Sequence, residues 1–296
     1  MLPKRSKNVF KISRALAANC DKTEERRSWL AQLPGIIAEL ERRWSLTIGH
    51  SFDGEEVSCA WVALVKLPDH SSAVLKIGMP HFENLHEIEG LLFWSGDPTV
   101  HLLNSDSHLG AMLLERCEPG THLRTLRQPD QDAVIAALLK RLWRRPNSSF
   151  PFRPLSALLE SWTQETLAQE QHWPDSGLVR TGLDLWNELL RSTKSGVLLA
   201  TDLHAGNVLR AQREPWLVID PKPFVGDAAY DATQHLLNCD DRLQSNFKAT
   251  TARFADLVGL DPDRVRLWTF SRLAAEPRDR WQSDAWFELA RALAKM

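Results

Sequence analysis

The chain has 296 residues, of which 43% are hydrophobic and 25% are charged, and its formal net charge at pH 7 is −2. This is the composition of an ordinary globular protein, and the length is sufficient for two lobes with a large buried core. The small net charge gives no electrostatic case for binding to nucleic acid or to an anionic membrane, so we expect neither as a partner.

The cysteines and the N-terminus bear on the cellular compartment. The four cysteines are scattered without a Cys-x-x-Cys spacing, which indicates neither a zinc site nor a disulfide framework. Residues 1–14 are basic but lack the apolar stretch of a secretory signal. No segment approaches the roughly 20 apolar residues that a bilayer-spanning helix needs. We expect a cytoplasmic protein, either a monomer or a weak dimer.

The first predicted elements are helical and then extended. Apolar residues at helical spacing predict helix over 22–44, and Pro34 is expected to divide it into two helices because proline removes a backbone donor. Strands are predicted at 45–48, 57–65 and 73–77.

A glycine-containing loop is predicted between the first two strands. It includes Gly49 and Gly54, and the backbone N–H groups of such a hairpin could lie over nucleotide phosphates. The loop has no Gly-x-Gly-x-x-Gly pattern, and any hairpin can use glycine, so an ordinary turn is an equal alternative.

Lys76 is the lone charge in an apolar strand, Val74–Ile77. A buried lysine is costly unless it is paired, so we expect a carboxylate partner. The helix predicted over 80–94 follows directly and contains several glutamates, although a solvated helix face would also explain them.

The rest of the chain is predicted to be mainly helical. Strands at 100–103 and 110–117 end in a turn at Glu118–Gly120, which we take as a domain boundary, giving domains 1–118 and 119–296. Amphipathic patterns then predict further helices at 130–143, 155–167, 178–190 and from 247 onward with a break at 259–263.

The region from Glu160 to Glu188 is acidic, with Arg180 as its one arginine or lysine. Its carboxylates would attract and pair a polycationic small molecule. A solvated helix surface explains the same charges and is the simpler interpretation. The acids are Glu160, Glu165, Glu170, Asp175, Asp184 and Glu188.

Two polar breaks after apolar runs carry the clearest chemical signal. Asp202 and Asn207 have the Asp-x-x-x-x-Asn spacing of a kinase catalytic loop, in which the aspartate receives the proton of the attacked hydroxyl and the asparagine holds Mg²⁺. Asp220 ends the next apolar run, where kinases place a second metal ligand. Turn formation would explain any one of these residues alone, but not the ordered set.

The motif resembles a known family. Thr201–Leu209 is similar to the catalytic loop of aminoglycoside phosphotransferases, with Thr201 where the family usually has glycine. Ile219–Asp231 resembles the streptomycin 6-kinase and hydroxyurea phosphotransferase branch, and His86–Trp94 resembles a helix of the same family.

The resemblance implies an α+β, two-lobed protein-kinase-like fold. It comprises a small antiparallel-sheet lobe with one main helix, preceded here by a helical N-terminal extension, and a large, mostly helical lobe. ATP would be bound by Lys76, with Glu87 as its partner and Glu89 as second choice, and by backbone groups around Glu115 and Cys117.

The remaining implied roles belong to the second lobe. Asp202 would be the catalytic carboxylate, Asn207 and Asp220 would hold Mg²⁺, and Asp231 would support the loop from below, with His235 a core or surface residue. The acceptor would be a hydroxylated small molecule, most simply streptomycin. The alternative acceptors are hydroxyurea, a peptide antibiotic or another metabolite. A different alternative is that the chain is a non-catalytic, kinase-like binding protein.

Overall fold

The structure is a computed structural model that describes residues 10–55, 57–278, 281 and 284–295. Most of the N-terminal segment considered above for a secretory signal, residues 1–9, lies outside this part. The chain forms two compact units. Unit 1 comprises the residues up to Gly120 together with Ala211–Pro215, and unit 2 comprises Thr121–Arg210 and the residues from Trp216 onward.

Unit 1 is built on a five-stranded sheet in the order β1-β2-β3-β5-β4. All neighbouring strands are antiparallel, which confirms the predicted small lobe. The strands are β1 (Thr47–Phe52), β2 (Ala60–Lys66), β3 (Ser72–Gly78), β4 (Leu102–Asp106) and β5 (Ala111–Glu115).

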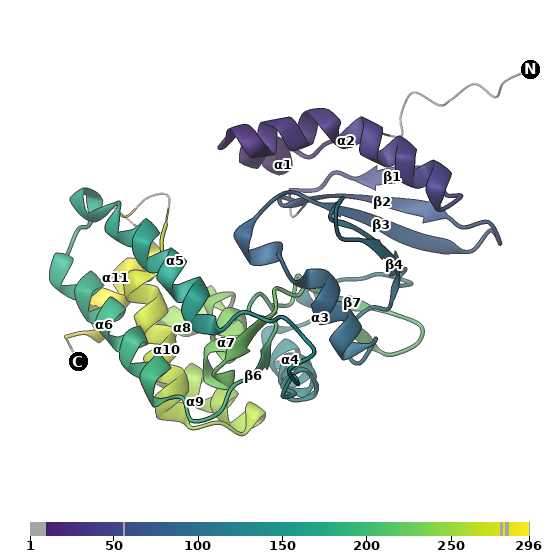
Figure 1. Ribbon diagram of the computed structural model, residues 1–296. Coiled ribbons are helices and arrows are strands. Elements are labelled where there is room, and N and C mark those ends of the chain that lie inside the picture. Colours follow the sequence, from purple (N-terminus) through teal and green to yellow (C-terminus); the bar gives the residue numbers. More distant parts are fainter. Residues whose placement is uncertain (1–9, 56, 279–280, 282–283, 296) are drawn as a thin grey trace, which may run out of the picture. The chain divides into compact units, whose positions relative to one another are not determined.

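Two N-terminal helices, α1 (Arg14–Cys20) and α2 (Glu24–Arg43), lie across one face of this sheet (Figure 1). Alternate strand residues such as Trp61 and Leu75 pack against them in one core. The prediction that Pro34 splits the helix was wrong, since α2 is continuous through it. An interior proline costs a helix about 3 kcal/mol, and the buried apolar face of α2 offsets that cost.

Lys76 lies on the opposite face of the sheet, because its neighbours Leu75 and Ile77 belong to the core beneath the helices. The helix predicted over 80–94 is shorter than expected. A 3₁₀ turn at Phe82–Asn84 precedes α3, which spans Glu87–Trp94.

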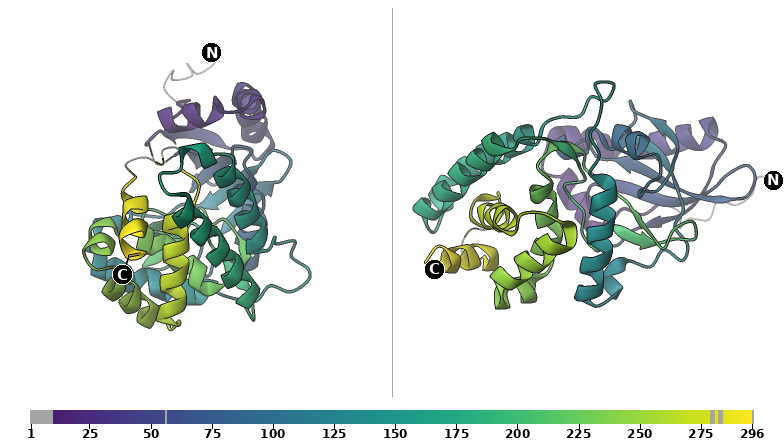
Figure 2. Two further views of the ribbon diagram at one scale, coloured as in Figure 1. Left: turned by 90° about the vertical axis from the view of Figure 1, so that its left-hand side faces the viewer. Right: turned by 90° about the horizontal axis from the view of Figure 1, so that it is seen from below.

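Unit 2 is mostly helical, as predicted. Helix α10 packs against α6, α7, α9 and α11, and Figure 2 shows these helices from two sides. Short 3₁₀ turns lie at Leu123–Thr125 and Glu170–His172. The helices are α4 (Gln128–Leu142), α5 (Leu155–Leu167), α6 (Ser176–Ser192), α7 (Ala228–Leu237), α8 (Asp240–Ser245), α9 (Phe247–Val258), α10 (Pro262–Ala275) and α11 (Ala285–Leu293).

Two short antiparallel strand pairs in unit 2 carry the predicted catalytic segments. Strand β6 (Val197–Leu199) pairs with β9 (Phe224–Gly226), and β7 (Val208–Arg210) pairs with β8 (Trp216–Val218). The β6–β7 loop therefore holds Asp202 and Asn207, and the β8–β9 loop holds Asp220.

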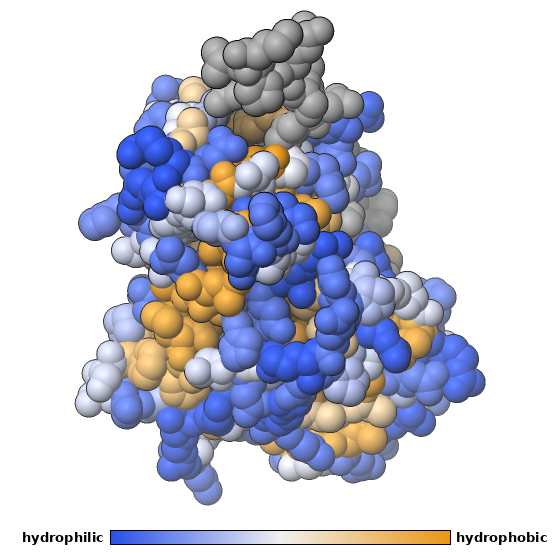
Figure 3. All heavy atoms as spheres, turned by 90° about the vertical axis from the view of Figure 1, so that its right-hand side faces the viewer, coloured by the Kyte–Doolittle hydropathy of each residue, from blue (hydrophilic) through white to orange (hydrophobic). Residues whose placement is uncertain are grey.

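The surface is mixed in polarity. On the face drawn in Figure 3, hydrophobic residues gather in separate patches within a larger hydrophilic area. Such a mixture is usual for folded proteins, whose surface cannot be covered by polar atoms alone. In the part of the chain that the structure describes, no helix has the length and apolarity required to cross a membrane.

Candidate active site

In unit 1, Lys76 forms a buried ion pair with Glu87. The ammonium nitrogen lies 2.6 and 2.7 Å from the two carboxylate oxygens, and the residues are 6% and 3% exposed. Glu87 is in the first turn of α3, where the helix dipole favours a negative charge. Of the two glutamates considered, Glu87 is thus the one that contacts the lysine, while Glu89 is partly exposed.

Of the two glycines expected in the loop between β1 and β2, Gly54 lies there and Gly49 does not. Gly49 lies inside β1, where a Cβ atom would come within 2.8 Å of the Leu64 carbonyl oxygen of β2. The backbones of β1 and β2 lie so close together at this point that a side chain at position 49 would require the strands to shift. Gly54 lies in the connection between β1 and β2.

The expected adenine-binding segment follows β5. Glu115 ends that strand, and its backbone N–H already donates to the His101 carbonyl oxygen at 2.9 Å. Burial acts to raise the pKa of its carboxyl group, but hydrogen bonds from Arg213 and from the backbone of His101 hold it below its ordinary value. Cys117 lies beyond the strand, and burial raises the pKa of its thiol to about 12.

In unit 2, the β6–β7 loop presents Asp202 with a partner on each carboxylate oxygen. Oδ1 accepts a hydrogen bond of 2.9 Å from the side-chain amide of Gln234, and Oδ2 lies 2.9 Å from the ammonium nitrogen of Lys222. The Asp202 side chain is 22% exposed, so it is both held and accessible.

Asp231 supports this loop from within the core, as the resemblance implied. It is fully buried on α7 and accepts the backbone N–H groups of Ala200 and Thr201 at 3.1 and 2.7 Å, and the Trp143 indole N–H at 2.9 Å. Burial raises the pKa of Asp231 to about 6 despite these hydrogen bonds. The carboxyl group fixes the backbone that leads into Asp202.

Two non-glycine residues near the site have a left-handed backbone. Thr201 has a φ of 50° and Asp220 a φ of 54°. Such conformations cost of order 1–3 kcal/mol and are common at functional sites. The Thr201 hydroxyl donates to the Lys222 carbonyl oxygen at 2.6 Å, which ties the β6–β7 loop to the β8–β9 loop. Threonine, unlike glycine, can supply this hydrogen bond.

Asn207 and Asp220 are linked through the backbone. The N–H of Ile219, next to Asp220, donates to the Asn207 carbonyl oxygen at 2.9 Å. The Asn207 side-chain nitrogen donates to the Asp202 carbonyl oxygen at 2.9 Å, so the amide oxygen of Asn207 is the atom that could bind a cation. An amide oxygen and a carboxylate are hard donors, so these two residues fit a magnesium ion.

Gly206 has a packing role in the same loop. A Cβ atom there would lie 2.6 Å from the imidazole ring of His204, whose Nδ1 accepts the Gly206 N–H at 3.1 Å. Burial lowers the pKa of His204.

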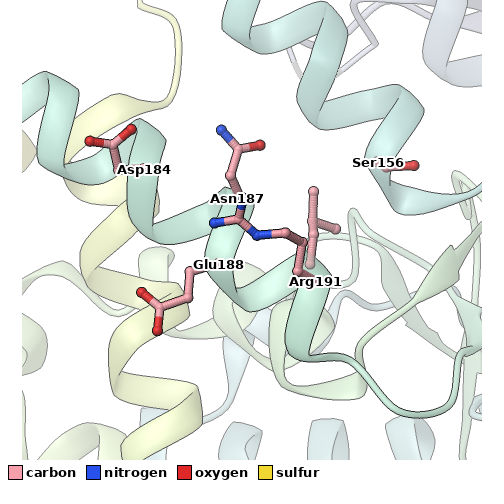
Figure 4. A pocket seen from close by; sticks show the side chains of 6 residues that line it. Ser156, Asp184, Asn187, Glu188 and Arg191 are labelled. Carbon is pink, nitrogen blue, oxygen red and sulfur yellow. The ribbon is translucent and has the colours of Figure 1, made fainter.

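The acidic residues predicted to attract a cation lie on α5, α6 and the segment between them. Glu170 pairs with Arg180, and Asp175 caps α6. Asp184 and Glu188 line a groove of about 560 Å³ together with Ser156, Asn187, Leu190 and Arg191. Figure 4 shows the two acids projecting from α6, with Ser156 on the neighbouring α5.

A second polar cluster surrounds Asp132. His235 is buried and lies 2.9 Å from this carboxylate, as expected for a core histidine. Among the residues that the structure describes, Asp132, His235 and Cys239 bring potential ligand atoms within 4.8 Å of one another. Arg242 already pairs with Asp132 at 2.7 Å, and its positive charge disfavours a metal ion there.

The sequence did not indicate the two side chains that contact the Asp202 carboxylate, Gln234 and Lys222. Gln234 could have been found, since it follows Asp231 by three residues on a predicted helix and so shares a face with it. Lys222 follows Asp220 by two residues, but nothing in a loop sequence shows where a side chain will point.

Comparisons with known proteins show the family of the chain. The chain matches the aminoglycoside/hydroxyurea antibiotic resistance kinase family over residues 43–284. Streptomycin 6-kinase from Streptomyces glaucescens is 34% identical over 278 residues, covering 90% of this chain and 89% of the relative. Hydroxyurea phosphotransferase from Kitasatospora aureofaciens is 34% identical over 258 residues, covering 83% and 73%.

A solved structure supports the fold. Choline kinase LicA from Streptococcus pneumoniae matches with a TM-score of 0.64 at 12% identity, covering 90% of this chain and 100% of that one. At this identity the likeness concerns the fold alone. Fold and family together define a small-molecule kinase with a protein-kinase-like fold. The chain belongs to the aminoglycoside/hydroxyurea antibiotic resistance kinase family.

Proposed function

We propose that this kinase transfers the γ-phosphoryl group of ATP to a hydroxyl group of a cationic aminoglycoside such as streptomycin, in the cytoplasm. The observation that carries the chemistry is the Asp202 carboxylate, accessible yet held on both oxygens, in a loop fixed from below by Asp231. A carboxylate so placed can orient the acceptor hydroxyl and receive its proton.

The nucleotide contacts would come from unit 1. Lys76, held by Glu87, binds phosphate oxygens, and the Glu87 carboxylate compensates for the burial of the ammonium group. Backbone groups near Gly49 and Gly54 add phosphate contacts. The segment from Glu115 to Cys117 supplies backbone hydrogen bonds to adenine, and Cys117 is the better candidate because the Glu115 N–H is already used in the sheet.

Asn207 and Asp220 would hold Mg²⁺. When bound there, the ion would supply positive charge to offset the charge that develops on the phosphates during transfer. The residues contribute a fixed amide oxygen and a carboxylate on two loops joined by a backbone hydrogen bond.

The choice of streptomycin rests on relatedness and on charge. Two of the relatives act, by name, on streptomycin and on hydroxyurea, and both are 34% identical to this chain. The acids of the α5–α6 region favour the cation, because guanidinium groups pair with carboxylates in a bidentate manner. Hydroxyurea is neutral and gains nothing from them.

The test is ADP formation with purified protein, ATP and Mg²⁺ over a panel that includes streptomycin and hydroxyurea. We expect streptomycin to stimulate ADP formation, with a KM that rises as salt screens the carboxylates. Glu188→Gln should raise this KM more than it lowers kcat, because it removes binding that is common to the ground state and the transition state.

Glu24→Gln is a matched control, since Glu24 is highly exposed on α2 in unit 1. It should change neither constant. If millimolar streptomycin stimulates no ADP formation while hydroxyurea does, the aminoglycoside assignment is wrong and the kinase assignment stands.

A further inference from the structure

Gln234 connects the Asp202 carboxylate to a buried arginine. Its side-chain nitrogen donates to Asp202 Oδ1 at 2.9 Å, and its side-chain oxygen accepts from Arg272 Nη2 at 2.8 Å. A guanidinium group has donors alone, so the amide oxygen must face Arg272 and the NH₂ group must face Asp202. The orientation of the amide is therefore determined by chemistry.

Arg272 is itself immobilised. It is 3% exposed on α10, donates to Thr233 Oγ1 and to Glu276 Oε2 at 2.7 Å each, and lies over the Tyr230 ring at 5.1 Å from its centre. Because these contacts fix the Arg272 side chain, its hydrogen bond to Gln234 also fixes the position of the Gln234 amide. Two hydrogen bonds, one from Arg272 to Gln234 and one from Gln234 to Asp202, thus connect the buried core to the accessible carboxylate.

The two oxygens of Asp202 are consequently different. Oδ1 faces a neutral donor that cannot turn, whereas Oδ2 faces the ammonium group of Lys222, whose side chain is 17% exposed. Each carboxylate oxygen has two lone pairs, so either oxygen can accept a hydroxyl proton beside its present contact.

We propose that Gln234, oriented by Arg272, is a positioning residue that fixes the Asp202 side-chain torsion and so orients the carboxylate that receives the acceptor's proton. This rests on the catalytic role proposed for Asp202. In the transfer, the hydroxyl oxygen bonds to the γ-phosphorus while the bond from that phosphorus to the bridging oxygen breaks. The electron pair leaves with ADP, and the hydroxyl proton goes to the Asp202 carboxylate.

The first test is Gln234→Met, which keeps the length of the side chain and removes both hydrogen bonds. We expect kcat for acceptor phosphorylation to fall about 10- to 100-fold, as misplaced catalytic groups do, while both KM values change less than about twofold. Gln164→Met, at an exposed glutamine on α5, is the control and should leave kcat unchanged.

The second test is Gln234→Glu. The introduced carboxyl can still accept from Arg272, but when ionised it repels Asp202 and when protonated it can donate to it. Its activity relative to wild type should therefore be lowest at pH 8 and rise toward pH 6, whereas that of Gln234→Met should not. This variant keeps the contact with Arg272. If Gln234→Met does not fold, the pH dependence of Gln234→Glu relative to wild type tests the proposal by itself.

Wild-type kcat in Gln234→Met, or identical pH profiles for the two variants, would overturn the proposal. If Asp202→Asn is inactive while Gln234→Met is fully active, the positioning role alone fails. If Asp202→Asn is fully active, the catalytic role of Asp202 fails as well.

Discussion

Asp231 and Asp132 are both buried carboxylates of unit 2, yet they face opposite kinds of partner. Asp231 accepts two backbone N–H groups and an indole N–H, all of them neutral. Asp132 faces the guanidinium of Arg242 at 3.0 and 2.7 Å, and the ring of His235. Burial raises the pKa of Asp231 to about 6. Burial acts in the same direction on Asp132, but its partners lower that pKa to about 2.

The difference in partners corresponds to a difference in role: Asp231 sets the path of a loop, and Asp132 joins helices. The donors to Asp231 belong to the loop before Asp202 and to the residue that follows α4, so this carboxylate sets the backbone path at the active site. Asp132, His235 and Arg242 lie on α4, α7 and α8, so their contacts hold three helices together. Loss of the first carboxylate should lower both activity and stability, whereas loss of the second should lower stability alone.

The largest expected effect is that of Asp231→Ala. The change leaves two buried backbone N–H groups and the partly buried Trp143 indole N–H without an acceptor. We expect it to lower the free energy of unfolding by about 3 kcal/mol and kcat by about 100-fold. Denaturant unfolding and ADP formation measure the two quantities. Asp132→Asn is the matched comparison, and it should leave kcat within about twofold of wild type. A comparable loss of kcat in both variants would contradict the claim that only Asp231 supports the active-site loop.

The next largest effect is on the pH dependence of stability, which should have opposite signs for Asp132 and Asp231. The folded-state pKa of Asp132 is depressed from 3.8 to about 2, so its stabilisation is complete above pH 4 and is lost as the pH falls toward 2. Asp132→Asn should therefore cost on the order of 2 kcal/mol at pH 7 and less at pH 3.

The folded-state pKa of Asp231 is raised from 3.8 to about 6, so its carboxyl favours folding most below pH 4 and loses that contribution as the pH rises through 6. The stability difference between wild type and Asp231→Asn should shift by on the order of 2 kcal/mol in this range. Urea titrations at several pH values measure both slopes, and slopes of the same sign would contradict the comparison.

The smallest effect concerns Thr201, which the Asp231 carboxylate holds with a φ of 50°. Thr201→Gly relieves backbone strain but loses the hydroxyl bond to Lys222, so stability should change by less than about 1 kcal/mol. Thr201→Val keeps the strain and loses the same bond, and should cost about 1 kcal/mol more than the glycine variant. Thermal unfolding compares the two, and equal stabilities would show that the strain is negligible.

The features that the sequence predicted are those that local pattern encodes. A lone charge in an apolar strand indicated Lys76, and ordered spacing indicated Asp202, Asn207 and Asp220. The helix-breaking effect of Pro34 and the loop position of Gly49 were inferred from local propensity, and packing against the sheet decided both instead.

The other missed features depend on residues far apart in the chain. Arg272 contacts Gln234 from a helix nearly forty residues later, and a buried arginine has no periodic signature. Ala211–Pro215 returns to unit 1, where Arg213 donates to Glu115 and to the carbonyl oxygens of Gly96 and Thr99. No local pattern in a five-residue turn predicts such a contact.

The most direct test of the central claim, that the Asp202 loop performs phosphoryl transfer, is a transfer experiment with γ-labelled ATP. Wild-type protein and Asp202→Asn are compared at saturating ATP, Mg²⁺ and the acceptor identified in the panel, with nucleotide binding measured in parallel. We predict that the variant binds ATP as wild type does but transfers label to the acceptor about 10³-fold more slowly. Transfer at the wild-type rate by a variant that binds ATP normally would contradict the assignment of Asp202 as the catalytic carboxylate.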